Sequence, residues 1–130
     1  MVNSSRAARV LVVDDELLIR WALREALEAR GYAVTEAVDA ASARRAIDDE
    51  GARPDAVVLD YRLPDSNDFG LLRAIRRDVP AAPVIMMTAH GSAEMVEGAL
   101  TLGAYRVVHK PFDLDELART VERAIEGRVY

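Results

Sequence analysis

The sequence predicts an α/β domain built on a parallel β-sheet with helices on both faces. Two observations carry this prediction. Five short apolar runs alternate with segments of helical periodicity along the 130 residues, and such alternation is typical of βαβ units. Three of the runs are nearly continuous and rich in Val and Ile, as expected of strands that are covered on both faces. The length corresponds to one domain, so the five units are expected to share a single sheet.

The expected strands are the apolar runs themselves. They cover residues 10–13, 33–35, 56–59, 84–87 and 105–108. The second run alternates apolar and polar residues more than the others, which favours a place nearer an edge of the sheet. The pair Met86–Met87 lies within the fourth run and is expected in the core.

The first three expected helices follow the first three runs. In the first, apolar residues from Ile19 to Leu27 recur at i, i+3, i+4 and i+7, which makes one apolar stripe. Gly31 is expected to end this helix. The second helix is expected to begin after Asp39, and the third is expected to bury Leu71.

The last two helices have recognisable starts. The fourth is expected to begin near Ser92. The fifth has the strongest signals, because Asp113 can cap it and Glu116 stands at the matching capping-box position. Phe112 and Leu117 stand where a hydrophobic staple would place them.

Composition excludes several classes of function. The chain has 17 Lys and Arg against 22 Asp and Glu, a net charge of −5, which argues against direct nucleic-acid binding. Cysteine is absent, which excludes disulfides, thiol nucleophiles and cysteine-based metal sites. The N-terminus lacks a signal-peptide layout, and no segment approaches the roughly 20 apolar residues of a membrane helix. We therefore expect a cytoplasmic protein without a membrane segment.

Polar residues follow the expected strands at the points where the strands end. They are Asp14, Asp15 and Glu16 after the first run, Asp60 after the third, Thr88 after the fourth, and His109 and Lys110 after the fifth. Ligands of open parallel sheets bind beyond the carboxyl ends of the strands. We therefore expect these side chains to converge at one edge of the sheet.

The chemistry of this set favours a phosphoryl site with a hard metal ion. Two carboxylates about 4 Å apart repel by about 4 kcal/mol at an effective dielectric constant of 20, so a cluster of carboxylates needs a cation. Oxygen ligands suit Mg²⁺, which usually binds beside a phosphate. Lys110 adds a positive charge and Thr88 a hydroxyl. Asp60 could then act as a nucleophile that forms an acyl phosphate.

The chain resembles the receiver (phosphoacceptor) domain of two-component response regulators. The resemblance rests on VLVVDDE at 10–16, PDAVVLDYRLPD at 54–65, PVIMMTAH at 83–90 and HKPFDLDEL at 109–117. It implies a flavodoxin-like (βα)5 fold, a doubly wound five-stranded parallel sheet with strand order 2-1-3-4-5. It also implies a single domain over 1–130, with a core at about 8–126, an N-terminal tail at 1–7 and a C-terminal end at 127–130 that could start a linker.

The resemblance assigns the phosphoacceptor and the metal ligands. Asp60 corresponds to the residue that is phosphorylated to 4-aspartylphosphate. Asp15 corresponds to a direct ligand of Mg²⁺ (or Mn²⁺), and Asp14 to a residue that orients the ion. The backbone carbonyl of Arg62 corresponds to the third protein ligand. Lys110 corresponds to the residue that bonds a phosphoryl oxygen.

The resemblance also assigns contacts around the phosphoryl group. Thr88 corresponds to the hydroxyl that turns toward a phosphoryl oxygen, and the amide of Ala89 to a further donor. Pro111 follows Lys110 in the family's Lys-Pro pair, in which the peptide bond is typically cis.

Two positions depart from the family pattern. Receivers usually carry Tyr or Phe three residues before the lysine, where this chain has Val107. Tyr105 and His109 share the face of Val107, but each lies about 6.6 Å along the strand, so the usual coupling of Thr88 to an aromatic ring is in doubt. Asp68 stands where receivers commonly have glycine. If that position needs a positive φ, the loop is expected to be remodelled.

The implied function is a phosphorylation switch rather than an enzyme. The domain would take a phosphoryl group from a sensor histidine kinase, with only its own phosphorylation and dephosphorylation as chemistry. It would then change the surface of its fourth helix, fifth strand and fifth helix to control an output domain or a partner, with a homodimer as one possibility. The segments IRWALREAL, MTAHG and KPFDLDEL resemble receivers of sigma-54-type transcription activators.

Several other interpretations stay open at this point. A phosphatase of the aspartyl-phosphate type would have a second Asp where this chain has Arg62. A phosphate-independent (degenerate) receiver would act as an interaction module. His90 and His109 are interpreted as loop residues. Trp21 either packs against the sheet or, with Leu17 and Leu18, marks a kinase-facing surface.

Overall fold

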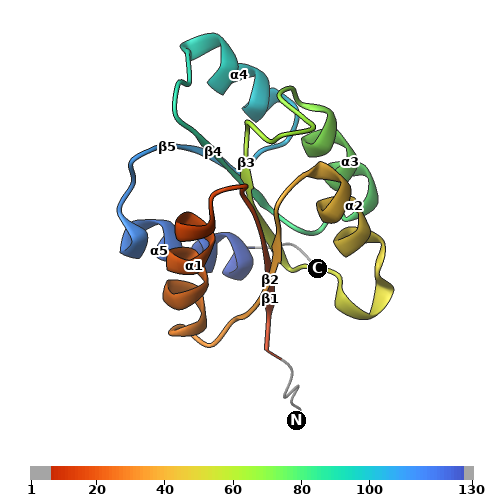
Figure 1. The fold of residues 1–130 in the computed structure, drawn as a ribbon, viewed down its shortest axis with the longest axis vertical. Helices are drawn as coiled ribbons and strands as arrows, with labels where there is room; N and C mark the ends of the chain where they lie inside the picture. The colour runs from red at the N-terminus through yellow and green to blue at the C-terminus, as the bar shows by residue number, and fades with distance from the viewer. Residues whose placement is uncertain (1–6, 128–130) are drawn as a thin grey trace.

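The computed structural model describes residues 7–127 and contains one five-stranded parallel sheet (Figure 1). The strands are β1 (Arg9–Val13), β2 (Ala33–Ala37), β3 (Ala56–Asp60), β4 (Val84–Thr88) and β5 (Arg106–His109). The helices are α1 (Leu17–Glu28), α2 (Ala40–Asp48), α3 (Gly70–Asp78), α4 (Ala93–Thr101) and α5 (Leu114–Glu126). A short 3-10 helix, Glu50–Ala52, which the sequence did not indicate, precedes β3.

The strand order is β2-β1-β3-β4-β5 and every neighbouring pair is parallel. This confirms the predicted doubly wound fold. The second strand lies at one edge of the sheet, as its alternating pattern indicated, and β5 lies at the other. The five expected strands agree with the observed ones to within two residues at each end, and Tyr105 precedes β5 rather than opening it.

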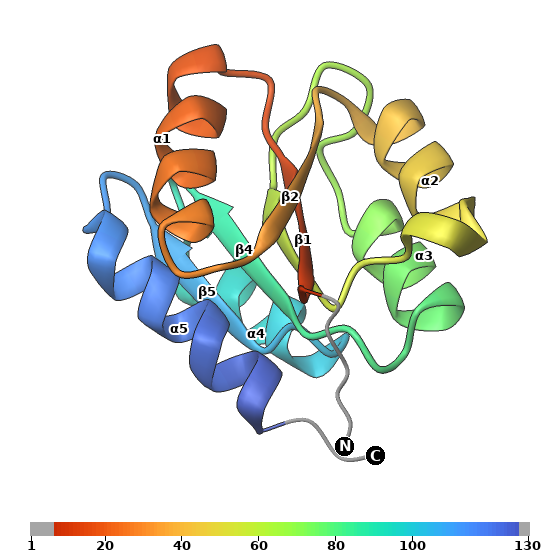
Figure 2. The same cartoon turned by 90° about the horizontal axis from the view of Figure 1, so that it is seen from below.

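The two faces of the sheet carry separate hydrophobic clusters. Leu11 and Val13 of β1 pack with residues of α2, α3 and α4, whereas Val10 and Val12 pack with residues of α1 and α5. Side chains along a strand alternate between faces, so one apolar run serves both clusters. Figure 2 shows α1 and α5 on one side of the sheet and α2 and α3 on the other.

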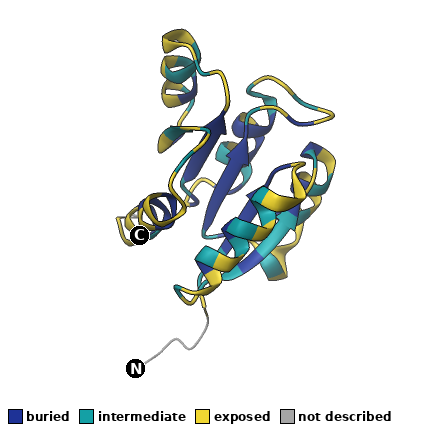
Figure 3. Ribbon diagram, turned by 60° about the vertical axis from the view of Figure 1, so that its left-hand side comes forward, coloured by how far each residue is buried: buried dark blue, intermediate teal, exposed yellow. Residues whose placement is uncertain are grey.

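Burial follows this layered arrangement. The central strands are mostly dark blue in Figure 3, while the edge strands β2 and β5 are less buried and the outer faces of the helices are exposed. All five residues of β3 and of β4 are buried, and Met86 and Met87 lie in the core as predicted. Within residues 7–127 no helix has the length and apolar character that a membrane span requires.

Side-chain caps fix several helix starts where the sequence indicated them. Ser92 accepts a hydrogen bond from the amide of Met95 at the start of α4, and Asp113 accepts one from the amide of Glu116 at the start of α5. Asp39 caps α2 and forms a reciprocal capping box with Ser42. These caps determine where each helix begins, and therefore how long the loops at the carboxyl edge of the sheet are.

Candidate functional site

Charged side chains gather at the carboxyl edge of the sheet because neighbouring strands end there. Asp14 directly follows β1 and Asp60 ends β3, and these two strands are paired in parallel. Thr88 ends β4, and Lys110 directly follows β5. The topology thus brings together residues up to 96 positions apart in the chain, as the sequence predicted.

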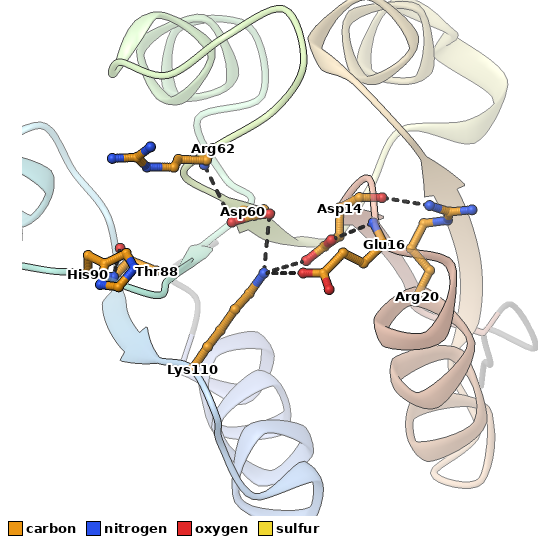
Figure 4. A network of polar contacts seen from close by, with 8 residues as sticks. All are labelled: Asp14, Glu16, Arg20, Asp60, Arg62, Thr88, His90 and Lys110. Atoms are coloured by element: carbon orange, nitrogen blue, oxygen red, sulfur yellow. Dashed lines mark hydrogen bonds and ion pairs between the residues drawn. The ribbon is translucent and has the colours of Figure 1, made fainter.

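The Lys110 ammonium group lies among the carboxylates of Asp14, Glu16 and Asp60, and these four residues are called the acidic pocket below (Figure 4). Its Nζ donates to Asp14 Oδ2 at 3.0 Å, to Asp60 Oδ2 at 3.2 Å and to Glu16 Oε1 at 3.4 Å. Burial favours the neutral amine, but the hydrogen bond to Asp14 and the charges of Asp60 and Asp14 raise the pKa of Lys110 above its usual value. The lysine is therefore a permanent cation at this edge of the sheet.

Asp14 is fully buried and is fixed by several bonds. Its Oδ1 accepts from the amide of Glu16 at 2.8 Å, and its backbone carbonyl accepts from a guanidinium nitrogen of Arg20 at 2.8 Å. Its amide donates to the carbonyl of Ala37 on β2 at 3.1 Å. Both the peptide and the carboxylate of Asp14 are therefore held in one orientation.

Asp60 is a buried carboxyl whose ionisation is unfavourable in this pocket. Its burial, followed by the negative charge of Asp14, raises the pKa of Asp60 to about 6, although Lys110 and the amide of Arg62 act in the opposite direction. A group with this pKa is largely ionised at neutral pH and responds strongly to any added positive charge.

The donor set fits a hard divalent cation. Asp14, Asp15 and Asp60 offer one carboxylate oxygen each within 4.8 Å of one another, and Asp15 is exposed while the other two are buried. The ammonium of Lys110 already bonds two of these carboxylates, which indicates that the pocket attracts positive charge. Oxygen ligands of this kind are those that Mg²⁺ prefers.

The comparison with known families decides what kind of domain this is. The sequence model of the response regulator receiver domain matches residues 10–122. The chain belongs to the response regulator receiver domain family.

Relatives of this receiver domain are much longer proteins. The DNA-binding transcriptional regulator NtrC of Escherichia coli K12 is 39% identical over 116 residues, which cover 89% of this chain and 24% of NtrC. The nitrogen assimilation regulatory protein NtrX of Azorhizobium caulinodans is 39% identical over 119 residues, which cover 90% of this chain and 26% of NtrX. The chain thus spans about a quarter of the length of these curated relatives. The predicted likeness to receivers of sigma-54-type activators is confirmed.

A solved structure of a related receiver agrees with the fold. The receiver domain of NtrX from Brucella abortus superimposes with a TM-score of 0.81 at 39% identity, covering 91% of this chain and 98% of that one. A CheY-like receiver from Methanospirillum hungatei gives a TM-score of 0.87 at 27% identity, covering 93% and 95% of the two chains.

Thr88 and Arg62 lie at the site, each with a contact that the sequence did not indicate. Thr88 is buried, and its hydroxyl oxygen accepts from the amide of His90 at 3.2 Å. The hydroxyl is therefore engaged with the loop that contains Ala89. The amide of Arg62 donates to Asp60 Oδ1 at 3.4 Å, and its guanidinium points away from Lys110 (Figure 4).

The structure also shows where Pro111, Val107, Tyr105 and Asp68 lie. The Lys110–Pro111 peptide bond is cis, as the resemblance implied. Val107 is partly buried against the cluster on the α2, α3 and α4 face, and Tyr105 is 44% exposed. Asp68 has no positive φ, so the possible strain there is excluded. Instead its Oδ1 accepts from the amide of Gly70 at 2.8 Å.

One interpretation from the sequence is wrong, and one of two alternatives that it left open is excluded. His109 is not a loop residue, because it ends β5, and its Nε2 lies 3.4 Å from the carbonyl of Gly91. Trp21 does not pack against the sheet, because 59% of its surface is exposed, beside exposed Leu17 and Leu18 on α1. His90 does lie in the loop after β4, as expected.

Sequence reasoning missed two residues that organise the site. Arg20 bonds the backbone of Asp14, as described above. Asp65, in the loop after Asp60, accepts bonds from the amides of Ala40 and Ala41 at 2.8 and 3.0 Å and so fastens that loop to the start of α2. No local pattern signals either contact, because each joins separate elements.

Proposed function

We propose that Asp60 accepts a phosphoryl group from a phosphohistidine of a sensor kinase in a reaction that needs Mg²⁺ or Mn²⁺. The phosphorylated domain then controls an output domain or a separate partner in transcription regulation. The observation that supports this proposal most is the convergence of Asp60 with Asp14, Asp15 and Lys110 at one edge of the sheet.

The chemistry proposed for Asp60 is an in-line displacement at phosphorus. A carboxylate oxygen of Asp60 forms the new P–O bond while the P–N bond of the phosphohistidine breaks, and the imidazole nitrogen keeps the electron pair and takes a proton. Such transfers depend mainly on positioning and charge neutralisation. The ammonium of Lys110, now bonded to Asp60 at 3.2 Å, would move onto a phosphoryl oxygen.

The metal ligands proposed are carboxylates of Asp15 and Asp60 and the carbonyl of Arg62, with Asp14 orienting the ion. When bound, Mg²⁺ would neutralise part of the carboxylate charge and hold phosphoryl oxygens. Added positive charge would also lower the pKa of Asp60 from about 6, which keeps the nucleophile ionised at neutral pH.

Thr88 and Ala89 are proposed to form hydrogen bonds with the phosphoryl group. The hydroxyl of Thr88 would leave the amide of His90 and turn to a phosphoryl oxygen, and the amide of Ala89 would donate to another. Phosphorylation adds a charge of about −1.5 to −2. A coupling free energy of about 1–3 kcal/mol between two sites is typical of such switches. The α4–β5–α5 surface is proposed to be the site that responds to phosphorylation. Val107 stands where receivers usually carry the aromatic residue of the switch. Tyr105 or another side chain would therefore have to take that part.

The proposed kinase-docking surface lies on α1. Leu17, Leu18 and Trp21 are exposed there by 66%, 77% and 59%. Next to them is an apolar groove of about 460 Å³, whose lining includes Ile19, Phe112 and Lys110. Large exposed apolar side chains beside a reactive site are typical of interaction surfaces, and this surface adjoins the phosphoacceptor pocket.

The domain is proposed to act in the cytoplasm, as a single unit over 1–130 with its core at about 8–126. Its phosphorylation is proposed to control an attached output domain, with dimer formation as one possible route. It is proposed to make no direct nucleic-acid contact and to turn over no external substrate.

The first prediction concerns phosphorylation itself. Incubation with Mg²⁺ and acetyl phosphate should add one phosphoryl group per chain, measured by intact-mass spectrometry, because the pocket can act on a small phosphodonor without the kinase. Asp60→Asn should abolish the gain, and chelation of the metal should prevent it. An unmodified parent chain would instead favour the degenerate receiver, and sustained phosphate release from unrelated monoesters would favour an enzyme.

A further inference from the structure

Arg20 of α1 reaches from the helix to the backbone of the acidic pocket. Its guanidinium donates to the carbonyl oxygen of Asp14 at 2.8 Å and, through Nε, to Glu36 Oε1 at 2.9 Å (Figure 4 shows the first bond). The Arg20 side chain is only 11% exposed. The bonds are therefore made in a shielded place, where a charge-assisted hydrogen bond is strong.

The bond to Asp14 acts on Asp15 as well. The carbonyl of Asp14 and the amide of Asp15 belong to one planar peptide unit, so the bond from Arg20 to this carbonyl also fixes the plane that leads to the Cα atom of Asp15. Asp15 is the exposed member of the carboxylate group. Within residues 7–127 no hydrogen bond or ion pair holds its side chain, so the placement of Asp15 depends on the backbone that leads into it.

Glu36 holds the guanidinium in place. This residue lies on β2, which pairs with β1, and its two carboxylate oxygens accept from Arg20 Nε and from Arg24 Nε at 2.9 and 2.6 Å. Burial acts against ionisation, but the bonds from Arg24 and Arg20 lower the pKa of Glu36 below its usual value. Glu36 is therefore ionised and anchors both arginines.

We propose that Arg20 is a positioning residue for the metal-binding pocket, which it serves by fixing the Asp14–Asp15 peptide. The inference deepens the proposed function and rests on it, because it requires that the pocket bind a divalent cation. Outer-shell partners of metal ligands typically change metal affinity by about 10- to 100-fold when they are removed. The Arg20 guanidinium would be such a partner, acting through backbone rather than through a side-chain ligand.

Arg24 supplies a matched control. It shares the Glu36 carboxylate with Arg20 and sits one turn further along α1, but its other bond goes to Glu28 at 3.0 Å, away from the pocket. Arg24→Met therefore removes the same kind of ion pair to Glu36. It leaves the bond between Arg20 and the Asp14 carbonyl intact.

The test is Mg²⁺ binding by isothermal titration calorimetry to the wild-type chain, Arg20→Met and Arg24→Met. Arg20→Met should weaken Mg²⁺ binding by about 10-fold, while Arg24→Met should stay within about 2-fold of the wild type. The Mg²⁺ concentration for half-maximal phosphorylation by acetyl phosphate should rise in parallel, with the rate restored at high Mg²⁺. Urea unfolding of all three proteins shows whether each is folded.

A second pair of variants protects the test from a folding failure. If Arg20→Met does not fold, Arg20→Lys and Glu36→Gln take its place. The ammonium of a lysine cannot bond the Asp14 carbonyl and Glu36 in the same way as the guanidinium does. The Glu36→Gln variant removes the carboxylate charge that holds Arg20. Both should weaken Mg²⁺ binding. Equal Mg²⁺ affinity of the wild type and the folded Arg20 variants, or equal weakening by Arg20→Met and Arg24→Met, would overturn the inference alone. A wild-type chain that binds no Mg²⁺ would overturn the proposed function as well.

Discussion

Asp60 is the residue at which function and stability conflict. Its buried carboxyl has a pKa of about 6, above its usual 3.8. Between these two pH values the folded protein binds more protons than the unfolded chain. The free energy of unfolding therefore falls as the pH rises from about 4 to about 6, and the loss persists above that range. At neutral pH the domain thus carries a carboxylate that burial disfavours, and the proposed phosphoryl transfer requires that carboxylate.

Asp60→Asn should for this reason stabilise the metal-free protein at neutral pH. The expected gain in the free energy of unfolding is on the order of 1–2 kcal/mol at about pH 7.5, after allowance for solvent screening. It should shrink toward zero near about pH 3, where the wild-type carboxyl is largely protonated in both states. Urea denaturation with a chelator present, at both pH values, measures the difference. A variant that is less stable than the parent at pH 7.5 would show that Asp60 is held by its contacts with Lys110 rather than opposed by burial.

At the scale of the elements, the loop between β4 and α4 is the tightest part of the site. Thr88 and His109 are partners across β4 and β5, and both side chains close on Gly91. A Cβ atom at Gly91 would lie 2.7 Å from Thr88 Cγ2 and 2.9 Å from His109 Nε2. Real contacts of this kind are longer, so a side chain at Gly91 must displace Thr88, His109 or the loop that carries Ala89.

Gly91→Ala should therefore impair phosphorylation through the loop. Overpacking of this kind typically costs about 1–3 kcal/mol of stability, and displacement of the Ala89 amide should slow phosphorylation by acetyl phosphate several-fold. Gly51→Ala is the control, because its Cβ would meet only Asp49 Oδ1 at an ordinary 3.5 Å. Rates and urea midpoints of both variants can be compared directly. A Gly91→Ala protein with the parent's phosphorylation rate would exclude a role for this loop geometry.

At the scale of the whole molecule, topology explains what the sequence could and could not predict. Asp14, Asp60 and Lys110 were predictable because strand ends of a parallel sheet meet at one edge, whatever the side-chain conformations. The contacts of Arg20 were not, because its partners are Asp14, directly after β1, and Glu36 on β2, and a long side chain can reach several such groups. The cap that Asp65 gives to α2 depends in the same way on the approach of two loops.

The contacts of Thr88 and Asp68 show a second limit of sequence reasoning. The family pattern gives Thr88 a contact with a bound phosphoryl group and does not indicate that its hydroxyl also accepts from the amide of His90, because a side-chain torsion is set by nearby partners. For Asp68 the pattern left open whether the position needs a positive φ, and the structure shows none there. Local hydrogen bonding decides such details, whereas hydrophobic periodicity decides the sheet.

The most direct test of the central claim is a crystal structure grown with Mg²⁺ and beryllofluoride. We predict a fluoroberyllate group on a carboxylate oxygen of Asp60, with Lys110 and the Thr88 hydroxyl on its fluorides. The metal should be held by Asp15 and the Arg62 carbonyl together with Asp60. A structure in which both remain absent from this edge of the sheet, or bind elsewhere, would contradict the account.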